Sequence, residues 1–505
     1  MAQGVLPFQY EVEKKTGGMT ALAGLPTYLE FGHVMGLSKA IENRLMIRSG
    51  DQGWSDGETV MALVLLNLAG GEGLSDLDIL EGDEGFCRVL RETVGFGKSR
   101  RDGRALSKRL RKEQKRSVVS PSSASRYLYH FHDPEQEKLR KEGTSFIPVP
   151  NEYLRAMMPA NGDFLGSVQK RCPQAIATLD LDATLVETNK REALYCYKGH
   201  KAYQPLQVYW AEQDLIVHTE FRDGNVWAET DNLRVFQEAL AFLPAGVSKV
   251  YLRSDTAGYQ HDLMRFCANP NKPRFGVIEF AIGAKVSESF KRAVSEVEES
   301  EWCRLYRRTK KGLIDTGQEY AEVCFVPDEP ARKKDGPVFR YVAIREVLEQ
   351  PALPDMEEQI SQPFPTMNFG SVKYKVFGIV TNRDIPGDEL IWWYRGRCGK
   401  SEEAHSVMKE DLAGGRLPSG YFGVNAAWWH IMILALNLSS AMKRLVLGGT
   451  WLGKRMKAIR FWLIKLPGRV LNRARMLRVR LVGGHGSNEA LFEMRRKILS
   501  LWESG

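Results

Sequence analysis

Two aspartates inside an apolar, strand-like run are the feature that most limits how this chain folds. The run ATLDLDATLVE places Asp180 and Asp182 two positions apart among alanine, leucine and threonine. Side chains two apart on a β-strand point to the same face, so both carboxylates belong to one side of a sheet. Burying an acid costs free energy unless it is paired or holds a metal. The run therefore predicts a buried strand with a polar site on one face.

Two further acids lie in segments that suit the same site. Asp255 ends the strand-like run SKVYLRSD, and Glu402 opens the helical stretch SEEAHSVMK. Strand-borne and helix-borne carboxylates of this kind can hold two divalent metals, which serve phosphodiester chemistry at an attacking and a leaving oxygen. Mg²⁺ or Mn²⁺ suits such oxygen ligands, and three acids suffice because waters and phosphates complete the coordination. We predict Asp182, Asp255 and Glu402 as catalytic metal ligands, with Asp180 as the second choice for the first acid.

The charge balance favours an anionic partner. The chain has 505 residues, a net charge of +9 and a pI near 9.0, and its length predicts about two to four domains. No acid occurs between Asp411 and Glu489, and a second basic block runs from Lys98 to Arg116. A solvated face explains many charge runs, but a span this long without an acid predicts contact with nucleic acid.

Single residues in these regions are candidate DNA contacts. Arg126 lies in SPSSASRYLYHFHD, which predicts either the entry to a recognition helix or an ordinary capped helix. The remaining candidates come from the two basic regions: Arg109, Lys454, Arg455, Arg473 and Arg475.

Other composition features exclude several classes. The seven cysteines form no CxxC pair, which argues against a zinc ribbon or a disulfide framework. The N-terminus has no signal-peptide pattern. The most apolar run, AAWWHIMILALNLSSAM, is short for a membrane span and predicts a buried core helix. We therefore expect a cytoplasmic protein with no membrane partner.

The pattern along the chain predicts an α/β fold. Three strands, a helix, a strand, a helix and a strand follow one another from about residue 170, which is the order of an RNase H-like core. We expect this catalytic core to be interrupted by a mostly β insertion and flanked by helical N-terminal and C-terminal DNA-binding regions. The predicted regions are 1–150 (helical), 170–283 (core, first part), 284–375 (insertion), 376–415 (core, last part, with the Glu402 helix) and 416–505 (basic, helical).

Two other functions fit part of the sequence. The run LDLDATL matches the DxDxT pattern of haloacid dehalogenase-like phosphatases, in which Asp180 is the nucleophile and Asp182 the general acid/base. That family also needs a later pair of acids, whereas YLRSDTAG offers one. A DNA-binding protein without catalytic activity would explain the basic regions but not acids inside apolar strands.

The segment WWYRGRCGKSEEAHSVMKEDL resembles the DDE transposases of bacterial insertion sequences that carry a Tyr-Arg-Glu-Lys signature. Tyr394 and Arg397 have the separation of that signature, and so do Glu402 and Lys409; four residues rather than three separate the two halves. LDLDAT and LRSDTAGY resemble the segments of the first two acids, and a threonine two residues after Asp182 favours it over Asp180. Within this group, the chain is most similar to the thirteen-eighty insertion-sequence family.

The resemblance implies an activity and partners. It implies cleavage at the terminal inverted repeats of a transposon and joining to target DNA, through a hairpin intermediate, by a homodimer assembled on double-stranded DNA near the bacterial nucleoid. It also implies that Tyr394, Arg397 and Lys409 contact phosphates, and the two cations suit this chemically. A flipped base at a hairpin needs an aromatic surface, for which the candidates are Trp302, Trp392 and Trp393.

Overall fold

The computed structural model describes residues 17–48, 53–94, 116–140, 145–327, 337–348, 364–473 and 476–503. The chain divides into two compact units. The first comprises residues 1–133, 150–160 and 407–505, and the second comprises residues 134–149 and 161–406. Each unit therefore combines segments that are far apart in the sequence.

The first unit is mainly helical. Helix α9 (Glu152–Arg171) begins in this unit and ends in the second. The other helices and strands of the first unit are β1 (Met19–Thr20), α1 (Leu25–Val34), α2 (Leu37–Arg44), α3 (Asp56–Ala69), α4 (Leu77–Gly82), α5 (Glu84–Val94), α7 (Pro121–Tyr129), α15 (Phe422–Met442), α16 (Met456–Ile459), β14 (Gly468–Arg473), β15 (Met476–Leu481) and α17 (Asn488–Glu503).

Helix α15 is the core of the first unit, as its apolar sequence predicts. Every one of its residues is buried, and it packs against α3. Helix α3 begins with a capping box, in which Ser55 and Glu58 each accept a backbone hydrogen bond from the other. The segment Phe422–Leu447 is long and apolar enough to cross a membrane. Helix α3 and the segment Leu74–Gly82 pass the same test only when taken together, and the two are bent by 95°. Because 78% of the apolar window of Phe422–Leu447 is buried inside the protein, it resembles the core helix of a soluble protein.

The C-terminal region is not helical throughout, contrary to the expectation for residues 416–505. Strands β14 and β15 form an antiparallel hairpin, and β1 pairs with β14 to make a three-stranded sheet. The run MLRVRL alternates exposed and half-buried residues along β15. This period of two is typical of a strand with one solvent-facing side. The sequence interpretation gave weight to the many cations in this region and did not identify the period.

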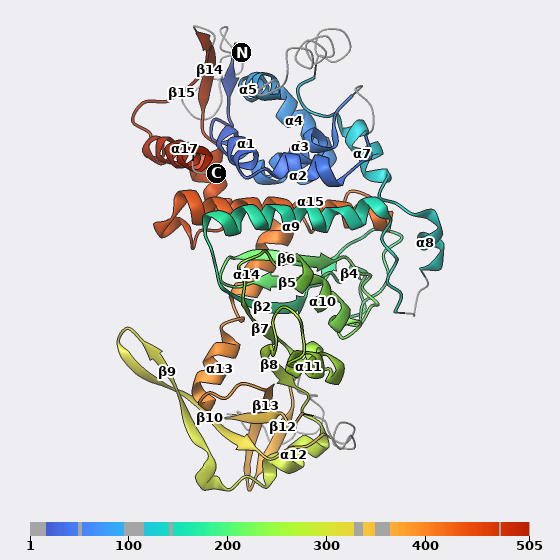
Figure 1. Ribbon diagram of the computed structural model, residues 1–505, viewed down its shortest axis with the longest axis vertical. Coiled ribbons are helices and arrows are strands. Elements are labelled where there is room, and N and C mark those ends of the chain that lie inside the picture. The colour runs from blue at the N-terminus through green and yellow to red at the C-terminus, as the bar shows by residue number, and fades with distance from the viewer. Residues whose placement is uncertain are drawn as a thin grey trace, which may run out of the picture. The chain divides into compact units, whose positions relative to one another are not determined.

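The second unit is built around one large mixed sheet (Figure 1). Its strand order is β6-β5-β2-β7-β8-β13-β11-β10-β9, with β12 paired to β13. Strand β2 is parallel to β7, and β7 is parallel to β8; the other pairs are antiparallel. The strands are β2 (Ile176–Ala183), β5 (Leu206–Trp210), β6 (Leu215–Glu220), β7 (Lys249–Ser254), β8 (Glu279–Ala284), β9 (Cys303–Thr309), β10 (Gly312–Val323), β11 (Arg340–Val347), β12 (Thr366–Phe369) and β13 (Val372–Thr381).

The order of elements in the first half of this unit matches the prediction. Strands β2, β5 and β6 are followed by a helix, β7, a second helix and β8. A small ladder of β3 (Val186–Glu187) and β4 (Ala202–Tyr203) lies between β2 and β5. The helices of the unit are α8 (Pro134–Leu139), α10 (Asn232–Phe242), α11 (His261–Ala268), α12 (Glu288–Ser295), α13 (Gly387–Arg395) and α14 (Lys400–Ser406).

The stretch expected as an insertion continues the same sheet. It is mostly β, as its sequence predicts, and contributes β9 to β12. Strand β13 pairs with β8 on one side and with β11 on the other. Without β13, the edge of β8 would leave backbone groups open to pairing with other chains. Strand β13 covers this edge, and the chain continues from β13 into α13 and α14.

Candidate active site

The register of two parallel strands brings the first two predicted acids together. On β2 and β7, Asp180 is paired with Arg253 and Leu181 with Ser254. Asp182 and Asp255 follow two residues after Asp180 and Arg253, on the same face and at the same end of the strand pair. Their carboxylates are close enough for Asp182 to raise the pKa of Asp255.

Asp180 forms a buried ion pair instead of an open site. Nε and Nη2 of Arg253 donate to its two carboxylate oxygens at 2.6 and 2.8 Å, and Nη1 donates to the carbonyl of Trp393 at 2.8 Å. The side chain of Asp180 is fully buried. Because both oxygens accept from one guanidinium, this carboxylate is poorly placed as a metal ligand or as a phosphatase nucleophile.

Asp182 and Asp255 each have one oxygen held and one open. Oδ2 of Asp182 accepts from the Ser401 hydroxyl at 2.7 Å and lies 3.4 Å from Nη2 of Arg397. Oδ1 of Asp255 accepts from the backbone N–H of Ala257 at 2.9 Å. Over the described part of the chain, no hydrogen bond reaches Oδ1 of Asp182 or Oδ2 of Asp255. Two fixed carboxylates with open oxygens suit a hard cation, which proteins often hold through one or two carboxylates.

Burial and mutual repulsion disfavour the ionised form of these two carboxylates. Burial raises the pKa of Asp255, the nearby Asp182 raises it further, and Arg397 opposes both. Burial alone would lower the pKa of the Arg397 guanidinium, but the two aspartates and Tyr394 leave it raised. Its Nε is buried and donates no hydrogen bond within the described residues. Arg397 is therefore a fixed cation with a donor to spare beside two acids.

Tyr394 lies beside the same pair. Its side chain is largely enclosed, and burial raises the pKa of its phenol to about 12 while Arg397 opposes the shift. Strand β8 admits the ring only because residue 283 is glycine. A Cβ on Gly283 would lie 3.0 Å from the Tyr394 hydroxyl and 3.2 Å from the carbonyl carbon of Asp255.

The third predicted acid, Glu402, is exposed on α14. Among the described residues, no group of three or more His, Cys, Asp and Glu side chains is gathered as a metal site. Its neighbour Ser401 bonds directly to Asp182, so the helix that carries Glu402 contacts the acid pair. The predicted triad is thus represented by two adjacent carboxylates and a third on the flanking helix.

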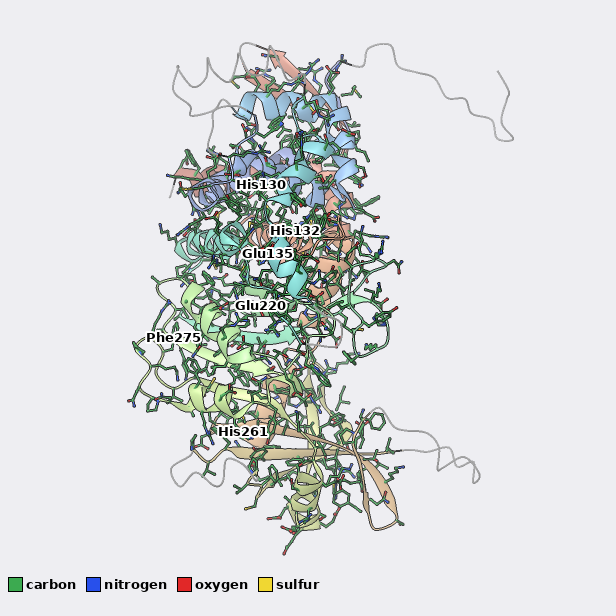
Figure 2. All side chains as sticks on the ribbon, turned by 90° about the vertical axis from the view of Figure 1, so that its right-hand side faces the viewer. His130, His132, Glu135, Glu220, His261 and Phe275 are labelled. Carbon is green, nitrogen blue, oxygen red and sulfur yellow. The ribbon has the colours of Figure 1, made fainter. Side chains whose placement is uncertain are left out.

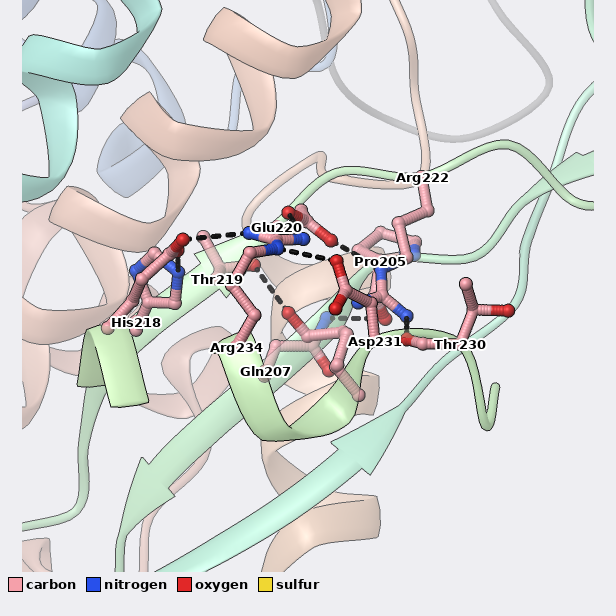
Figure 3. A network of polar contacts seen from close by, with 11 residues as sticks. Pro205, Gln207, His218, Thr219, Glu220, Arg222, Thr230, Asp231 and Arg234 are labelled. Carbon is pink, nitrogen blue, oxygen red and sulfur yellow. Dashed lines mark hydrogen bonds and ion pairs between the residues drawn. The ribbon is translucent and has the colours of Figure 1, made fainter. Parts of the chain in front are cut away.

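A second contact holds α14 to the sheet. His405 Nε2 lies 3.1 Å from Oε1 of Gln207, the residue that pairs with Asp182 across β2 and β5. Nε2 of Gln207 donates to the carbonyl of Pro205 at 3.2 Å (Figure 3), which leaves Oε1 for the contact with His405. Beside Gln207, Figure 3 shows the ion-pair network of β6 and α10.

The sequence interpretation did not identify Arg253, Ser401 or His405. A signal for Arg253 was present, because Arg-x-Asp at the end of β7 mirrors Asp-x-Asp in β2. Ser401 and His405 are one helical turn apart and so share a face of α14, but only the folded chain identifies what that face contacts.

The three candidate tryptophans are mostly packed. Trp302 is 9% exposed, and its ring lies against Arg345, whose guanidinium carbon is 4.1 Å from the ring centroid. Trp393 is half-buried between Arg253 and Arg383. Trp392 is half-buried and donates to a backbone carbonyl on β9. Trp302 therefore offers little surface to a base, whereas the other two keep partly exposed edges.

The candidate DNA contacts of the first unit differ in their exposure and in whether an acid neutralises them. Arg126 is exposed on α7, and Lys454 is exposed before α16. Arg455 is neutralised by Asp411, at 2.9 Å, and by a neighbouring glutamate. Lys409 is half-buried in a π-helical turn of this unit, Val407–Asp411. Arg473 is the last residue of β14, and Arg109 and Arg475 lie outside the described residues.

The segment after α7 is a packed aromatic cluster. His130 and His132 follow the helix directly (Figure 2). The ring of His132 lies 4.4 Å from that of Tyr421, and the ring of His130 lies 6.4 Å from that of Tyr153. The C-terminal end of α7 is therefore anchored, while Arg126 projects from it.

Comparisons with known proteins agree with a nuclease of the transposase class. The family model described as transposase DDE domain group 1 matches residues 8–336 and 359–502, which is most of the chain. The chain belongs to this family: it is a DDE transposase, an enzyme of DNA transposition and recombination.

The other two comparisons add little. No curated protein matches the chain. Among solved structures, it is similar to the cryo-EM structure of the piggyBac transposase synaptic complex with hairpin DNA, with 12% sequence identity and a TM-score of 0.40 over 95% of this chain and 80% of that one. A likeness at this level carries no argument about mechanism.

Proposed function

We propose that this transposase cuts DNA at the ends of its transposon and joins them to target DNA by two-metal chemistry, with Asp182, Asp255 and Glu402 as metal ligands. The observation that carries the proposal is the pair Asp182 and Asp255, adjacent at the ends of parallel strands with one open oxygen each. Divalent cations bound there supply nucleophile activation and charge stabilisation at the phosphodiester.

The remaining parts of the site have defined tasks in this proposal. Ser401 and the Ala257 N–H orient the two carboxylates. Arg397, a cation beside the two acids, binds a phosphate oxygen close to the cut. Tyr394 lies beside Asp255 and contacts the same phosphate group. Arg397 also opposes the rise in the pKa of Asp255 that burial and Asp182 cause, and so favours the ionised carboxyl.

The same proposal covers the finer features implied by the sequence. The five strands β6-β5-β2-β7-β8 form an RNase H-like core, supported by the element order of three strands, a helix, a strand, a helix and a strand. The reaction passes through a hairpin at the transposon ends, with the exposed edges of Trp392 and Trp393 as stacking surfaces. The active form is a homodimer on DNA in the bacterial cytoplasm, because two ends must be joined in one event.

The test is Mg²⁺-dependent cleavage of duplex DNA that carries the element's own ends, with products resolved on a denaturing gel. Asp182→Asn and Glu402→Gln should bind this DNA and fail to cut it. Glu403→Gln is the matched control, since it removes the same charge from the adjacent exposed position of α14 and should cut normally. Normal cleavage by Asp182→Asn or Glu402→Gln would refute the ligand assignment. Binding without any cleavage by the wild type would favour a DNA-binding protein without catalytic activity.

A further inference from the structure

Strands β9 and β10 form a two-stranded ribbon that extends beyond the packed part of the sheet (Figure 1). Leu305 is fully buried and marks the root of this ribbon. Past it, both faces are open: Tyr306, Leu313 and Ile314 are 45%, 66% and 54% exposed. We call residues 304–314 the basic ribbon. Its outer part buries almost nothing, so packing does not account for its sequence.

The basic ribbon carries a dense group of cations; the nearest acid on either strand, Asp315, follows it on β10 opposite Tyr306. Arg304 is paired with Glu319 at 3.3 Å, near the root. Arg307 and Arg308 lie on β9, and Lys310 and Lys311 form the turn that joins the strands; all four are exposed and make no ion pair within the described chain. Like charges at this spacing repel one another, so an anionic partner would stabilise the arrangement.

The dimensions of the basic ribbon fit duplex DNA. Two paired strands are about 4.8 Å apart, and the four residues of β9 beyond the root span about 14 Å. The major groove is about 12 Å wide and about 8.5 Å deep, and it admits a two-stranded β-ribbon. The ribbon is therefore long enough to enter the groove, where long arginine and lysine side chains can reach the phosphates on its two rims.

The root of the basic ribbon is tied to the helix that carries Tyr394. Trp392 Nε1 donates to the carbonyl of Tyr306 at 2.9 Å, and Arg395 donates to the side chain of Gln318 on β10 at 2.7 Å. Both donors lie on α13. DNA held by the ribbon is therefore linked through α13 to the acid pair beside Tyr394.

We propose that the basic ribbon inserts into a groove of duplex DNA and holds its backbone through Arg307, Arg308, Lys310 and Lys311. This inference rests on the proposed function, since it assigns a DNA-contacting element to the same enzyme. None of the cations predicted from the sequence as DNA contacts lies on this ribbon.

The test is the salt dependence of binding to a duplex of the transposon end. Arg307→Gln/Arg308→Gln should weaken binding and lower the magnitude of the log Kd versus log salt slope by about 0.9 for each phosphate that is no longer neutralised, so by about 2. Lys249→Gln/Lys291→Gln is a charge-matched control in the same unit, because each lysine is already paired with a carboxylate, at 2.9 and 2.7 Å. The control should leave the slope nearly unchanged. Thermal melts of both variants check that the fold is retained.

An unchanged affinity and slope in the arginine variant would overturn the proposal, and so would an equal loss in the control. A loss confined to single-stranded DNA would overturn the groove assignment. The proposed function fails separately: Asp255→Asn should not cut, yet it should show the same dependence on Arg307 and Arg308. If the wild type binds but does not cut, the catalytic proposal falls while the slope still tests the ribbon.

Discussion

Replacing Asp180 and Asp182 one at a time should give opposite outcomes, although the two residues share one strand face. Asp180→Asn removes one partner of a buried ion pair and leaves Arg253 without a counter-charge. Asp182→Asn removes the carboxylate that raises the pKa of the nearby Asp255. The first change should damage the fold, and the second should damage only the chemistry.

The magnitude for Asp180 follows from its burial. The side chains of Asp180 and Arg253 are 0% and 6% exposed, so solvent screens the pair little. Removing one partner of such a pair costs about 3–5 kcal/mol. For a cooperative unit of this size, 1 kcal/mol corresponds to about 2–4 °C in Tm, so Asp180→Asn should melt roughly 6–20 °C lower. Asp182→Asn should melt at or above the wild-type temperature.

The assay combines thermal melts with a Mg²⁺ titration and the cleavage test. A ligand that binds only the folded state stabilises it by about 2.7 kcal/mol at a hundredfold excess over Kd. Mg²⁺ should therefore raise the Tm of the wild type and of Asp180→Asn, but raise that of Asp182→Asn much less. A stable Asp180→Asn that no longer cuts, beside an active Asp182→Asn, would refute the reasoning and make Asp180 the first catalytic acid.

Two other changes probe the surroundings of the pair. Arg397→Gln removes the cation that lowers the pKa of Asp255; because burial and Asp182 already raise that pKa, the carboxyl should stay protonated to higher pH, and the acid limb of the cleavage rate profile should move up. A carboxyl whose pKa is raised in the folded state adds stability below its ordinary pKa, and this stability is lost as pH rises through the raised pKa. In Arg397→Gln the pKa of Asp255 is raised further, so the Tm of this variant should fall over a higher pH range than that of the wild type. Gly283→Ala should cost about 1–3 kcal/mol and slow cleavage, because its Cβ would lie 3.0 Å from the Tyr394 hydroxyl and 3.0 Å from a backbone nitrogen. Gly166→Ala, a helical glycine with nothing within 4 Å, is the control and should be neutral or slightly stabilising in the same melts.

Local patterns carried much of the fold. The apolar helix over residues 426–442 and the order of strands and helices from about residue 170 are set by neighbours in the sequence, and the structure confirms them. The hairpin of β14 and β15 was missed because its alternation is short and interrupted by cations. The joining of β11, β10 and β9 to the core sheet through β13 could not be predicted, since the pairing of β13 with β8 joins residues about a hundred positions apart.

The same limit applies to the acids. Two carboxylates on one strand face are equivalent in the sequence, and only the neighbouring strand distinguishes them. Strand β7 presents Arg253 opposite Asp180 and, two residues later, Asp255 beside Asp182. Residues two apart also share a face on the parallel strand β7. At the first level Asp180 therefore lies beside Arg253, and at the second level, two residues on, Asp182 lies beside Asp255. The first level needs no metal to be stable, whereas the second has repulsion that a cation relieves. The end of the strand pair is therefore where a metal gains most from binding, and that is a property of the register rather than of either aspartate alone.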